Sequence, residues 1–147
     1  MASKLQANQV FLTSTDTTIG FVSQNSDMLN HIKQRPKDKK FIRAVNSLNT
    51  LMDFTRVPKI HKKLVRRTEK TTFVILDQSF RVIKDSHHLL LIDRLKWAYT
   101  TSANLSGKEY DEDFALSVSD VVVYPLNRNT NASKIYKLGN KSIKRIR

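Results

Sequence analysis

Thr100-Thr101-Ser102-Ala103-Asn104-Leu105-Ser106-Gly107 is the stretch on which the fold prediction depends most. It follows the apolar run Trp97-Ala98-Tyr99 and closes on one of only three glycines in the chain. Ser, Thr and Asn side chains hydrogen-bond to nearby backbone, and glycine permits a left-handed residue, so the stretch favours a strand end or turn. We therefore predict a strand that runs out into a polar loop, where hydroxyl, amide and N–H groups can converge on a ligand. A hydroxyl-rich turn with no ligand is the alternative.

The length and composition indicate a single domain, predicted to span residues 1–147. A chain of 147 residues can bury a real hydrophobic core. The absence of cysteine excludes disulfides and thiolate metal sites, which suits a reducing cytosol. No apolar run is long enough for a membrane span, and residues 1–9 lack the apolar core of a signal peptide. A cytoplasmic protein with no membrane partner is the expectation.

The net charge of +13 is concentrated in two parts of the chain. Residues 33–70 contain 13 Lys and Arg but three acidic residues, and residues 128–147 contain seven with no acidic residue. Residues 71–127, in contrast, carry more acidic than basic side chains. A field of this size attracts the phosphates of a nucleotide or of a nucleic acid backbone. A basic surface that only keeps the protein soluble is the alternative.

Hydrophobic periodicity and turn residues predict strands mixed with helices, and therefore an α/β or α+β domain. Strands are expected at 10–12, 41–45, 71–76, 80–83, 97–99, 121–124 and 133–138, with a polar loop at 13–20 and a hairpin turn at 77–79. Helices are expected after Ser26 or Asp27, after Asn46, at 59–67, after Asp85 or Ser86, and at 110–116. In the helix at 59–67, Ile60, Leu64 and Val65 are predicted to point inward.

Motifs of common catalytic sites are missing from the sequence. There is no P-loop, no GxGxxG, no HExxH and no cysteine nucleophile, and adjacent His87 and His88 would point in different directions on a helix. What remains is two hydroxyl-rich loops and the pair Lys33 and Arg35, a set suited to binding phosphate oxygens. The two cations also suit a helix C-terminus, which is their structural alternative. Nucleotidyl transfer needs mainly positioning and charge neutralisation, which such a set can supply.

The same segments, in the same order, resemble the motifs of the YrdC family, the threonylcarbamoyl-AMP synthases of tRNA modification. Residues 14–20, Ser-Thr-Asp-Thr-Thr-Ile-Gly, are similar to the family's Pro-Thr-Glu-Thr-x-x-x-Gly. Lys33-Gln34-Arg35-Pro36 matches its Lys-x-Arg-Pro, and Asp38-Lys39 follows as the family tends to have it. Residues 101–107 match its Ser-Thr-Ser-Ala-Asn-x-Ser-Gly. Weaker likenesses cover Thr72-Phe73, Phe80-Arg81-Val82 and residues 133–138, so the resemblance spans roughly 10–138 and leaves a basic tail at 139–147.

The resemblance implies a YrdC-like twisted mixed β-sheet flanked by helices. It also implies an activity, the synthesis of L-threonylcarbamoyladenylate from L-threonine, bicarbonate and ATP, with release of pyrophosphate. The product supplies t6A37 in tRNA, so the proteins of the t6A transfer machinery are expected partners. Magnesium is expected to accompany ATP, with no metal ligand assigned in the protein.

The resemblance also implies roles for individual residues, although none is assigned a catalytic role. The ATP-binding candidates are Lys33, Arg35, Asn104 and Ser133. The threonine-binding candidates are Thr15, Ser102 and Arg81. Thr72 and Ser106 are expected to line the same pocket.

The chain departs from the family pattern at several positions. Ser14 replaces the proline of the first motif, Asp16 replaces its glutamate, and residues 67–71 stand where the family has Trp-Pro-Gly-Pro. Asn127-Arg128-Asn129-Thr130-Asn131-Ala132 stands in place of a glycine-rich loop. These departures concern the adenylate pocket more than the fold. The alternative function is therefore a non-catalytic YrdC-like protein that binds double-stranded RNA or a nucleotide through the basic residues at 56–67 and 134–147.

Overall fold

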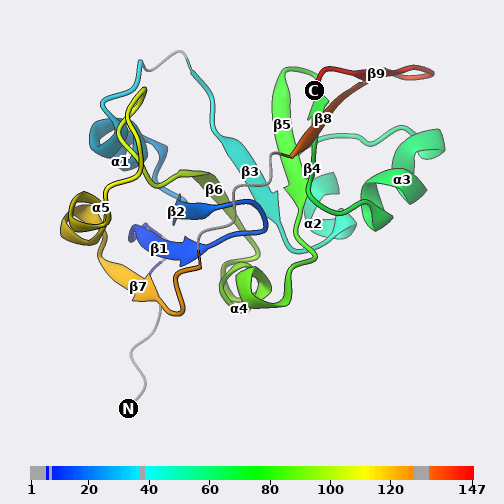
Figure 1. Ribbon diagram of the computed structural model, residues 1–147. Helices are drawn as coiled ribbons and strands as arrows, with labels where there is room; N and C mark the ends of the chain where they lie inside the picture. Colours follow the sequence, from blue (N-terminus) through cyan, green and yellow to red (C-terminus); the bar gives the residue numbers. More distant parts are fainter. Residues whose placement is uncertain (1–5, 7, 37–38, 128–132) are drawn as a thin grey trace.

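The strands of the chain form one mixed sheet in the computed structural model, which describes residue 6 and residues 8–36, 39–127 and 133–147 (Figure 1). Asp38 of the second motif and residues 128–132 of the Asn-rich loop lie outside the described residues. The strand order is β7-β1-β2-β6-β3-β5-β4-β8-β9. The bounds are β1 (Phe11–Ser14), β2 (Ile19–Ser23), β3 (Ile42–Val45), β4 (Thr71–Ile75), β5 (Gln78–Val82), β6 (Trp97–Ser102), β7 (Val121–Val123), β8 (Lys134–Leu138) and β9 (Ile143–Arg145). The pairs β1–β7, β3–β5 and β4–β8 are parallel and the other neighbours are antiparallel, which confirms the predicted mixed sheet.

The described helices are α1 (Ser26–Lys33), α2 (Leu48–Met52), the 3-10 turn η1 (Lys59–His61), α3 (Lys62–Arg67), α4 (Ser86–Leu95) and α5 (Glu112–Val118). Of these, α1, α2, α4 and α5 begin where a polar side chain caps the first turn, whereas η1 and α3 have no side-chain cap. Asp85 caps α4 as predicted, accepting a hydrogen bond from the His88 N–H. The caps of α1 and α2 are Asn25 and Ser47, each one residue from a predicted position. None of the helices in the described part of the chain is long and apolar enough to cross a membrane.

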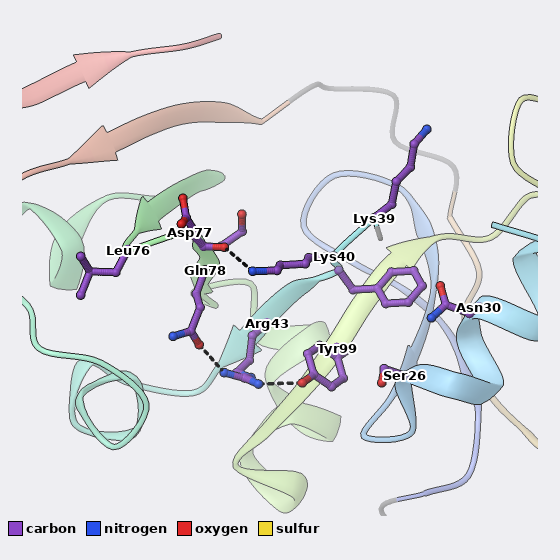
Figure 2. Close-up of a pocket in the computed structure, with 11 residues that line it drawn as sticks. Ser26, Asn30, Lys39, Lys40, Arg43, Leu76, Asp77, Gln78 and Tyr99 are labelled. Carbon is purple, nitrogen blue, oxygen red and sulfur yellow. Dashed lines mark hydrogen bonds between the residues drawn. The ribbon is translucent and has the colours of Figure 1, made fainter. Parts of the chain in front are cut away.

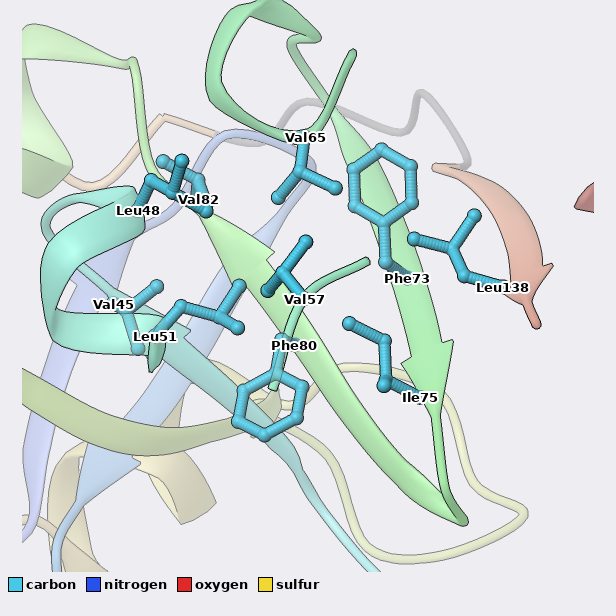
Figure 3. Packing of buried hydrophobic residues seen from close by; sticks show 10 residues of the cluster. All are labelled: Val45, Leu48, Leu51, Val57, Val65, Phe73, Ile75, Phe80, Val82 and Leu138. Carbon is cyan, nitrogen blue, oxygen red and sulfur yellow. The ribbon is translucent and has the colours of Figure 1, made fainter. Parts of the chain in front are cut away.

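Helices cover both faces of the sheet, and strand alternation decides which residues meet them. On one face, here called the α4 face, Phe11, Val22, Ala44 and Ala98 pack against α4. On the other, here called the four-helix face, Leu12 and Phe21 pack against α1 and α5. Further along the four-helix face, β3, β4 and β5 pack against α2 and α3 in the cluster of Figure 3. This cluster consists of Val45, Leu48, Leu51, Val57, Val65, Phe73, Ile75, Phe80, Val82 and Leu138.

Strand β2 differs from the sequence prediction, in which residues 13–20 are a loop. The loop proper is confined to residues 15–18, because Ile19–Ser23 pairs with both β1 and β6. All five residues of β2 are buried, so the segment lacks the polar–apolar alternation of a half-exposed strand. At the near edge of the sheet, β7 is half-buried because it has a partner strand on one side only, although its three valines predict a buried strand.

The prediction for residues 59–67 was partly wrong. Val65 is buried as expected, but Ile60 and Leu64 are 64% and 37% exposed. The segment starts as the 3-10 turn η1, whose three-residue period shifts the inward position to His61. The buried His61 ring lies against the turn between β8 and β9, with Nε2 2.9 Å from the Gly139 carbonyl oxygen.

The turn between β4 and β5 also differs from the prediction. Ile75 pairs directly with Gln78, so the loop consists of only Leu76 and Asp77 and not of residues 77–79. Both residues have left-handed backbone conformations, with φ of 48° and 65°. This matches the two-residue hairpin turn in which both central residues have positive φ.

Candidate functional site

A cavity of about 550 Å³ opens on the α4 face, where the polar ends of several strands converge. We call it the front cavity. Its walls are Thr15, Thr17, Thr18, Arg35, Lys40, Ile42, Arg81, Thr100, Thr101, Ser102, Ser133 and Arg147. Five predicted site residues, namely Thr15, Arg35, Arg81, Ser102 and Ser133, therefore meet at one cavity although they are far apart in the sequence.

The first hydroxyl-rich loop is held in shape by Thr15. Its Oγ1 donates to the Thr18 carbonyl oxygen at 2.6 Å and accepts from the N–H groups of Thr17 at 3.3 Å and Thr18 at 3.1 Å. Gly20 brings this loop close to the end of β6. A Cβ at that position would lie 2.9 Å from the Thr101 carbonyl oxygen and 3.0 Å from Thr15 Cγ2. Only glycine therefore allows the two polar loops to approach so closely.

Lys33, the last residue of α1, supports the loop at 102–107 and does not itself line the front cavity. Its ammonium group donates to the Ser102 carbonyl oxygen at 2.8 Å, to Ser102 Oγ at 3.4 Å and to Asn104 Oδ1 at 3.3 Å. The Lys33 residue is 3% exposed, and burial, with a smaller effect of the Arg35 charge, lowers its pKa to about 8. Its three donors are all used within the protein, so Lys33 positions the loop in this arrangement.

Asn104 and Ser106 serve the same loop and do not line the cavity. The Asn104 amide donates to the carbonyl oxygens of Leu105 at 2.9 Å and Lys108 at 2.7 Å, while the Ser106 N–H donates to the Lys33 carbonyl oxygen at 3.1 Å. Ligand contacts by Lys33, Asn104 and Ser106 therefore stay predictions. For these groups to bind a ligand, one of their hydrogen bonds within the protein would first have to break.

Arg35 lies at the cavity wall after the left-handed residue Gln34 ends α1. Its Nη2 donates to the Lys40 carbonyl oxygen at 3.2 Å, and its guanidinium carbon lies 4.7 Å from the centre of the Phe41 ring. Burial lowers the pKa of Arg35, yet a guanidinium keeps its charge at neutral pH. Arg35 therefore presents a positive charge with no carboxylate partner among the described residues.

Arg81 is the centre of a buried polar network. It forms an ion pair with Asp16 at 3.0 Å, the one ion pair in the described part of the chain. It also donates to Thr17 Oγ1 at 3.4 Å, twice to Thr72 Oγ1 at 3.2 and 2.8 Å, and to Ser133 Oγ at 2.8 Å. These contacts use its five N–H groups, so Arg81 orients the hydroxyl groups of Thr17 and Ser133 at the cavity. Thr72 is itself buried behind Arg81 and does not line the cavity.

Two further cations at the cavity, Lys40 and Arg147, were not predicted. Arg147 Nε donates to the Ser133 carbonyl oxygen and Nη2 to Ser133 Oγ, each at 3.0 Å. Its backbone pairs with Ile135, which brings the guanidinium to the wall of the cavity. The weak alternation of residues 141–147 was the available signal, since alternation is typical of a half-exposed strand. Together with Arg35, these residues give the cavity three cations without an acidic partner in the described residues.

The part of the chain that the structure describes does not form a protein metal site. The described residues contain no group of three or more His, Cys, Asp or Glu that could hold a metal ion. Asp16, which stands between the cavity-lining residues Thr15 and Thr17, is already paired with Arg81. Magnesium therefore stays a prediction that depends on the phosphates of ATP, and no step is derived through it.

Three comparisons place this arrangement among known proteins. The family model for Sua5, YciO and YrdC, described as telomere recombination, matches residues 3–147. A curated relative, the uncharacterized protein MG259 homolog of Mycoplasma pneumoniae, is 29% identical over 154 residues, which cover 96% of this chain and 33% of the relative. The chain thus spans about a third of the length of that relative.

Solved structures share the fold at low sequence identity. The P. abyssi Sua5 structure complexed with L-threonine has a TM-score of 0.82 at 18% identity, covering 95% of this chain and 50% of that one. The E. coli YciO structure has a TM-score of 0.74 at 16% identity, covering 95% of this chain and 82% of that one. The match of the family model over nearly the whole chain, together with these folds, confirms the resemblance seen in the sequence motifs. The chain belongs to the Sua5/YciO/YrdC family.

Proposed function

We propose that the front cavity makes L-threonylcarbamoyladenylate from L-threonine, bicarbonate and ATP, for the t6A37 modification of tRNA. The observation that carries the proposal is the meeting of Arg35, Lys40 and Arg147 with two hydroxyl-rich loops in one cavity. A triphosphate supplies the negative charge that these three cations lack within the protein. The hydroxyl and backbone groups of the two loops suit a small amino acid beside the phosphates.

In the proposed reaction, the threonine amine is carboxylated by bicarbonate to a carbamate, with loss of water. A carbamate oxygen then forms a bond to the α-phosphorus of ATP, and the bond from that phosphorus to the bridging oxygen of pyrophosphate breaks. Arg35, Lys40 and Arg147 offset the charge that develops on the leaving pyrophosphate. Thr15 and Ser102 contact threonine, Ser133 contacts the nucleotide, and Arg81 holds the surrounding hydroxyl groups in place. Lys33 contributes by keeping the Ser102 loop in the required shape.

Family membership supports the proposal, as does the fold shared with a Sua5 structure complexed with L-threonine. The proposal extends to the setting: a cytoplasmic enzyme that passes its adenylate to the proteins of the t6A transfer machinery.

The test is calorimetric titration with ATP, without and then with L-threonine, bicarbonate and magnesium, while pyrophosphate is assayed in the same samples. We expect pyrophosphate release that requires both L-threonine and bicarbonate, and that glycine in place of L-threonine does not support. Arg35→Gln should reduce release at least about 10-fold, whereas Arg67→Gln, on the exposed surface of α3, should not change it. ATP binding without pyrophosphate release under these conditions would contradict the proposal.

A second candidate function, RNA binding, is favoured by one specific feature. Residues 56–67 carry six basic and no acidic side chains, and His61 ties this segment to the β8–β9 turn, next to Lys141. A mononucleotide does not need positive charge spread so far from its cavity. RNA binding whose affinity falls steeply with salt, in a protein that releases no pyrophosphate, would favour this function instead.

A further inference from the structure

A second cavity, of about 530 Å³, lies on the four-helix face of the sheet (Figure 2). We call it the back cavity. Two neighbouring cross-strand pairs of β3 and β6 place it opposite the front cavity. Ile42 and Thr100 line the front cavity, whereas the next pair, Arg43 and Tyr99, lines the back cavity, because successive side chains alternate between faces.

The back cavity separates two parts of the hydrophobic core. On one side lies α1 with Ser26 and Asn30, and on the other lies the β4–β5 turn with Leu76 and Asp77. The cluster under α1 and α5 therefore ends at one side of the cavity, and the cluster under α2 and α3 ends at the other.

Arg43 provides a fixed positive charge at this cavity. Its Nη1 donates to Gln78 Oε1 at 3.1 Å and its Nη2 to the Tyr99 hydroxyl at 2.7 Å. Its guanidinium carbon lies 4.2 Å from the centre of the Phe54 ring and 5.0 Å from that of Trp97. Aromatic rings and neutral oxygens hold the guanidinium, and within the described residues it has no carboxylate partner. An anion in the cavity would neutralise this charge.

The other charges around the cavity also favour an anion. Lys39 and Lys40 line it, and Asp77 is the acidic residue that faces them. The Lys40 ammonium group donates to the backbone carbonyl oxygen of Asp77 at 3.4 Å, a long contact that a stronger acceptor can replace. Asn30 Oδ1 is buried beside the cavity without a hydrogen-bond partner. If the Asn30 side chain rotates toward the cavity, an N–H or O–H group of a ligand can donate a hydrogen bond to this oxygen.

The β4–β5 turn places an apolar side chain at the rim. Leu76 is 77% exposed and has a φ of 48°, a conformation that bulky residues rarely adopt. Asn-Gly is the usual sequence for such a turn, because both residues must take positive φ. The chain therefore keeps an exposed leucine at the cavity at a cost in local stability. Leu76 therefore offers an apolar surface to a flat ligand at the end of the cavity formed by the β4–β5 turn.

We propose that the back cavity is a binding site for a nucleoside phosphate. The phosphate lies against Lys40 and Arg43, which contact the turn residues Asp77 and Gln78, and the base packs on Leu76 of the same turn. The volume is that of an ordinary small-molecule pocket. Such a ligand is either a free nucleotide or the terminal nucleotide of an RNA chain, and both have the chemistry that these residues recognise. The site lies on the opposite face of the sheet from the front cavity and shares only Lys40 with its lining, and it does not depend on the activity proposed there.

Trp97 gives a direct optical probe of this site. It is the only tryptophan, its ring centre lies 5.3 Å from that of Tyr99, and it lies on the four-helix face. Titration with AMP should change its fluorescence saturably, whereas adenosine and ribose 5-phosphate, each with one half of the ligand, should bind at least about 10-fold more weakly. Competition by a five-nucleotide RNA at lower concentration than AMP would identify an RNA end as the ligand, and its absence would identify the free nucleotide.

Two sets of variants separate this proposal from a structural role of the same residues. Arg43→Met should abolish AMP binding. The double substitution Leu76→Asn with Asp77→Gly should raise Tm by about 2–4 °C, as a relaxed turn predicts, and still weaken AMP at least about 5-fold. Arg147→Gln, in the front cavity, should leave the fluorescence titration unchanged. No saturable change up to about 10 mM AMP, where even a weak site would fill, would overturn the proposal. Unchanged affinity in the more stable turn variant would also overturn it.

Discussion

The ammonium group of Lys33 donates a hydrogen bond to the Ser102 carbonyl oxygen at 2.8 Å and thereby joins the end of α1 to the end of β6. The basic motif and the hydroxyl-rich motif are thus parts of one structure. Lys33 and Arg35, two residues apart, have different surroundings: one is buried under the loop and the other lines the front cavity. Substitutions at the two positions should therefore have different effects.

Lys33→Met should destabilise the protein, and Arg35→Met should mainly affect ligand binding. Without the lysine, the Ser102 carbonyl and Asn104 Oδ1 lose a donor, which we expect to cost about 1–3 kcal/mol in the free energy of unfolding. Arg35→Met should leave that free energy within about 1 kcal/mol and weaken ATP at least about 10-fold. Urea unfolding and calorimetry with ATP measure the two effects. Equal loss of stability in both variants would contradict the different roles assigned to them.

The lowered pKa of Lys33 predicts a distinct pH dependence of stability. An unfolded lysine has a pKa near the ordinary value of 10.5, whereas burial lowers that of Lys33 to about 8 in the folded protein. Between these values the unfolded chain binds a proton that the folded chain does not, so the contribution of Lys33 to stability rises from pH 8 to 10.5. Below pH 8 both states are protonated and the cost of burying the charge is fully present.

Urea unfolding between pH 7 and 10, compared for the wild type and Lys33→Met, isolates this effect from the other titrating groups. The difference in unfolding free energy should shift in favour of the wild type as the pH rises. A proton NMR titration of the Lys33 side chain gives the pKa directly. A pKa at the ordinary lysine value, with a pH-independent difference, would show that the ammonium group is not desolvated.

The sequence predicted most strands and the meeting of the motif residues, but not the contacts within the site. Apolar runs such as 71–76 and 121–124 indicated strands correctly, because β-branched residues favour them. The family motifs predicted that Thr15, Arg35 and Ser102 would share one cavity. That Lys33 is buried could not be predicted, because its acceptors lie about 70 residues further along the chain.

Other features escaped prediction because tertiary contacts override local preference. The Leu76-Asp77 turn contains neither glycine nor asparagine, so no local signal indicates positive φ there. Arg147 belonged to a basic tail that alternates only weakly, and its place beside Ser133 depends on the pairing of β9 with β8. In both cases the local sequence pattern is weak, and the pairing of two neighbouring strands, β4 with β5 and β8 with β9, decides the result.

The ion pair between Arg81 and Asp16 should be one of the most sensitive points of the fold. Arg81→Met leaves the buried carboxylate of Asp16 without its partner, which we expect to cost about 3–5 kcal/mol. Adding Asp16→Asn removes this buried, unpaired negative charge, so the double variant should be more stable than Arg81→Met alone. Chemical unfolding of the wild type, both single variants and the double variant gives the coupling energy. Additive losses would show that the pair does not act as a unit.

Gly20→Ala should damage the front cavity more than the size of a methyl group suggests. The added Cβ would lie 2.9 Å from the Thr101 carbonyl oxygen and 3.0 Å from Thr15 Cγ2, so both residues must move, and both line the cavity. We expect a loss of about 1–3 kcal/mol in stability and weaker binding of L-threonine.

Gly107→Ala is the matched control for Gly20→Ala. Gly107 has a φ of +77°, and a methyl group added there would meet no described atom within 4 Å, so alanine should cost about 1–2 kcal/mol through backbone strain alone. Its effect on L-threonine binding should be small, because Gly107 does not line the front cavity. Thermal unfolding and calorimetry with L-threonine on both variants separate the two mechanisms. If Gly20→Ala binds L-threonine as the wild type does, the close approach of the two loops is not what shapes the threonine site.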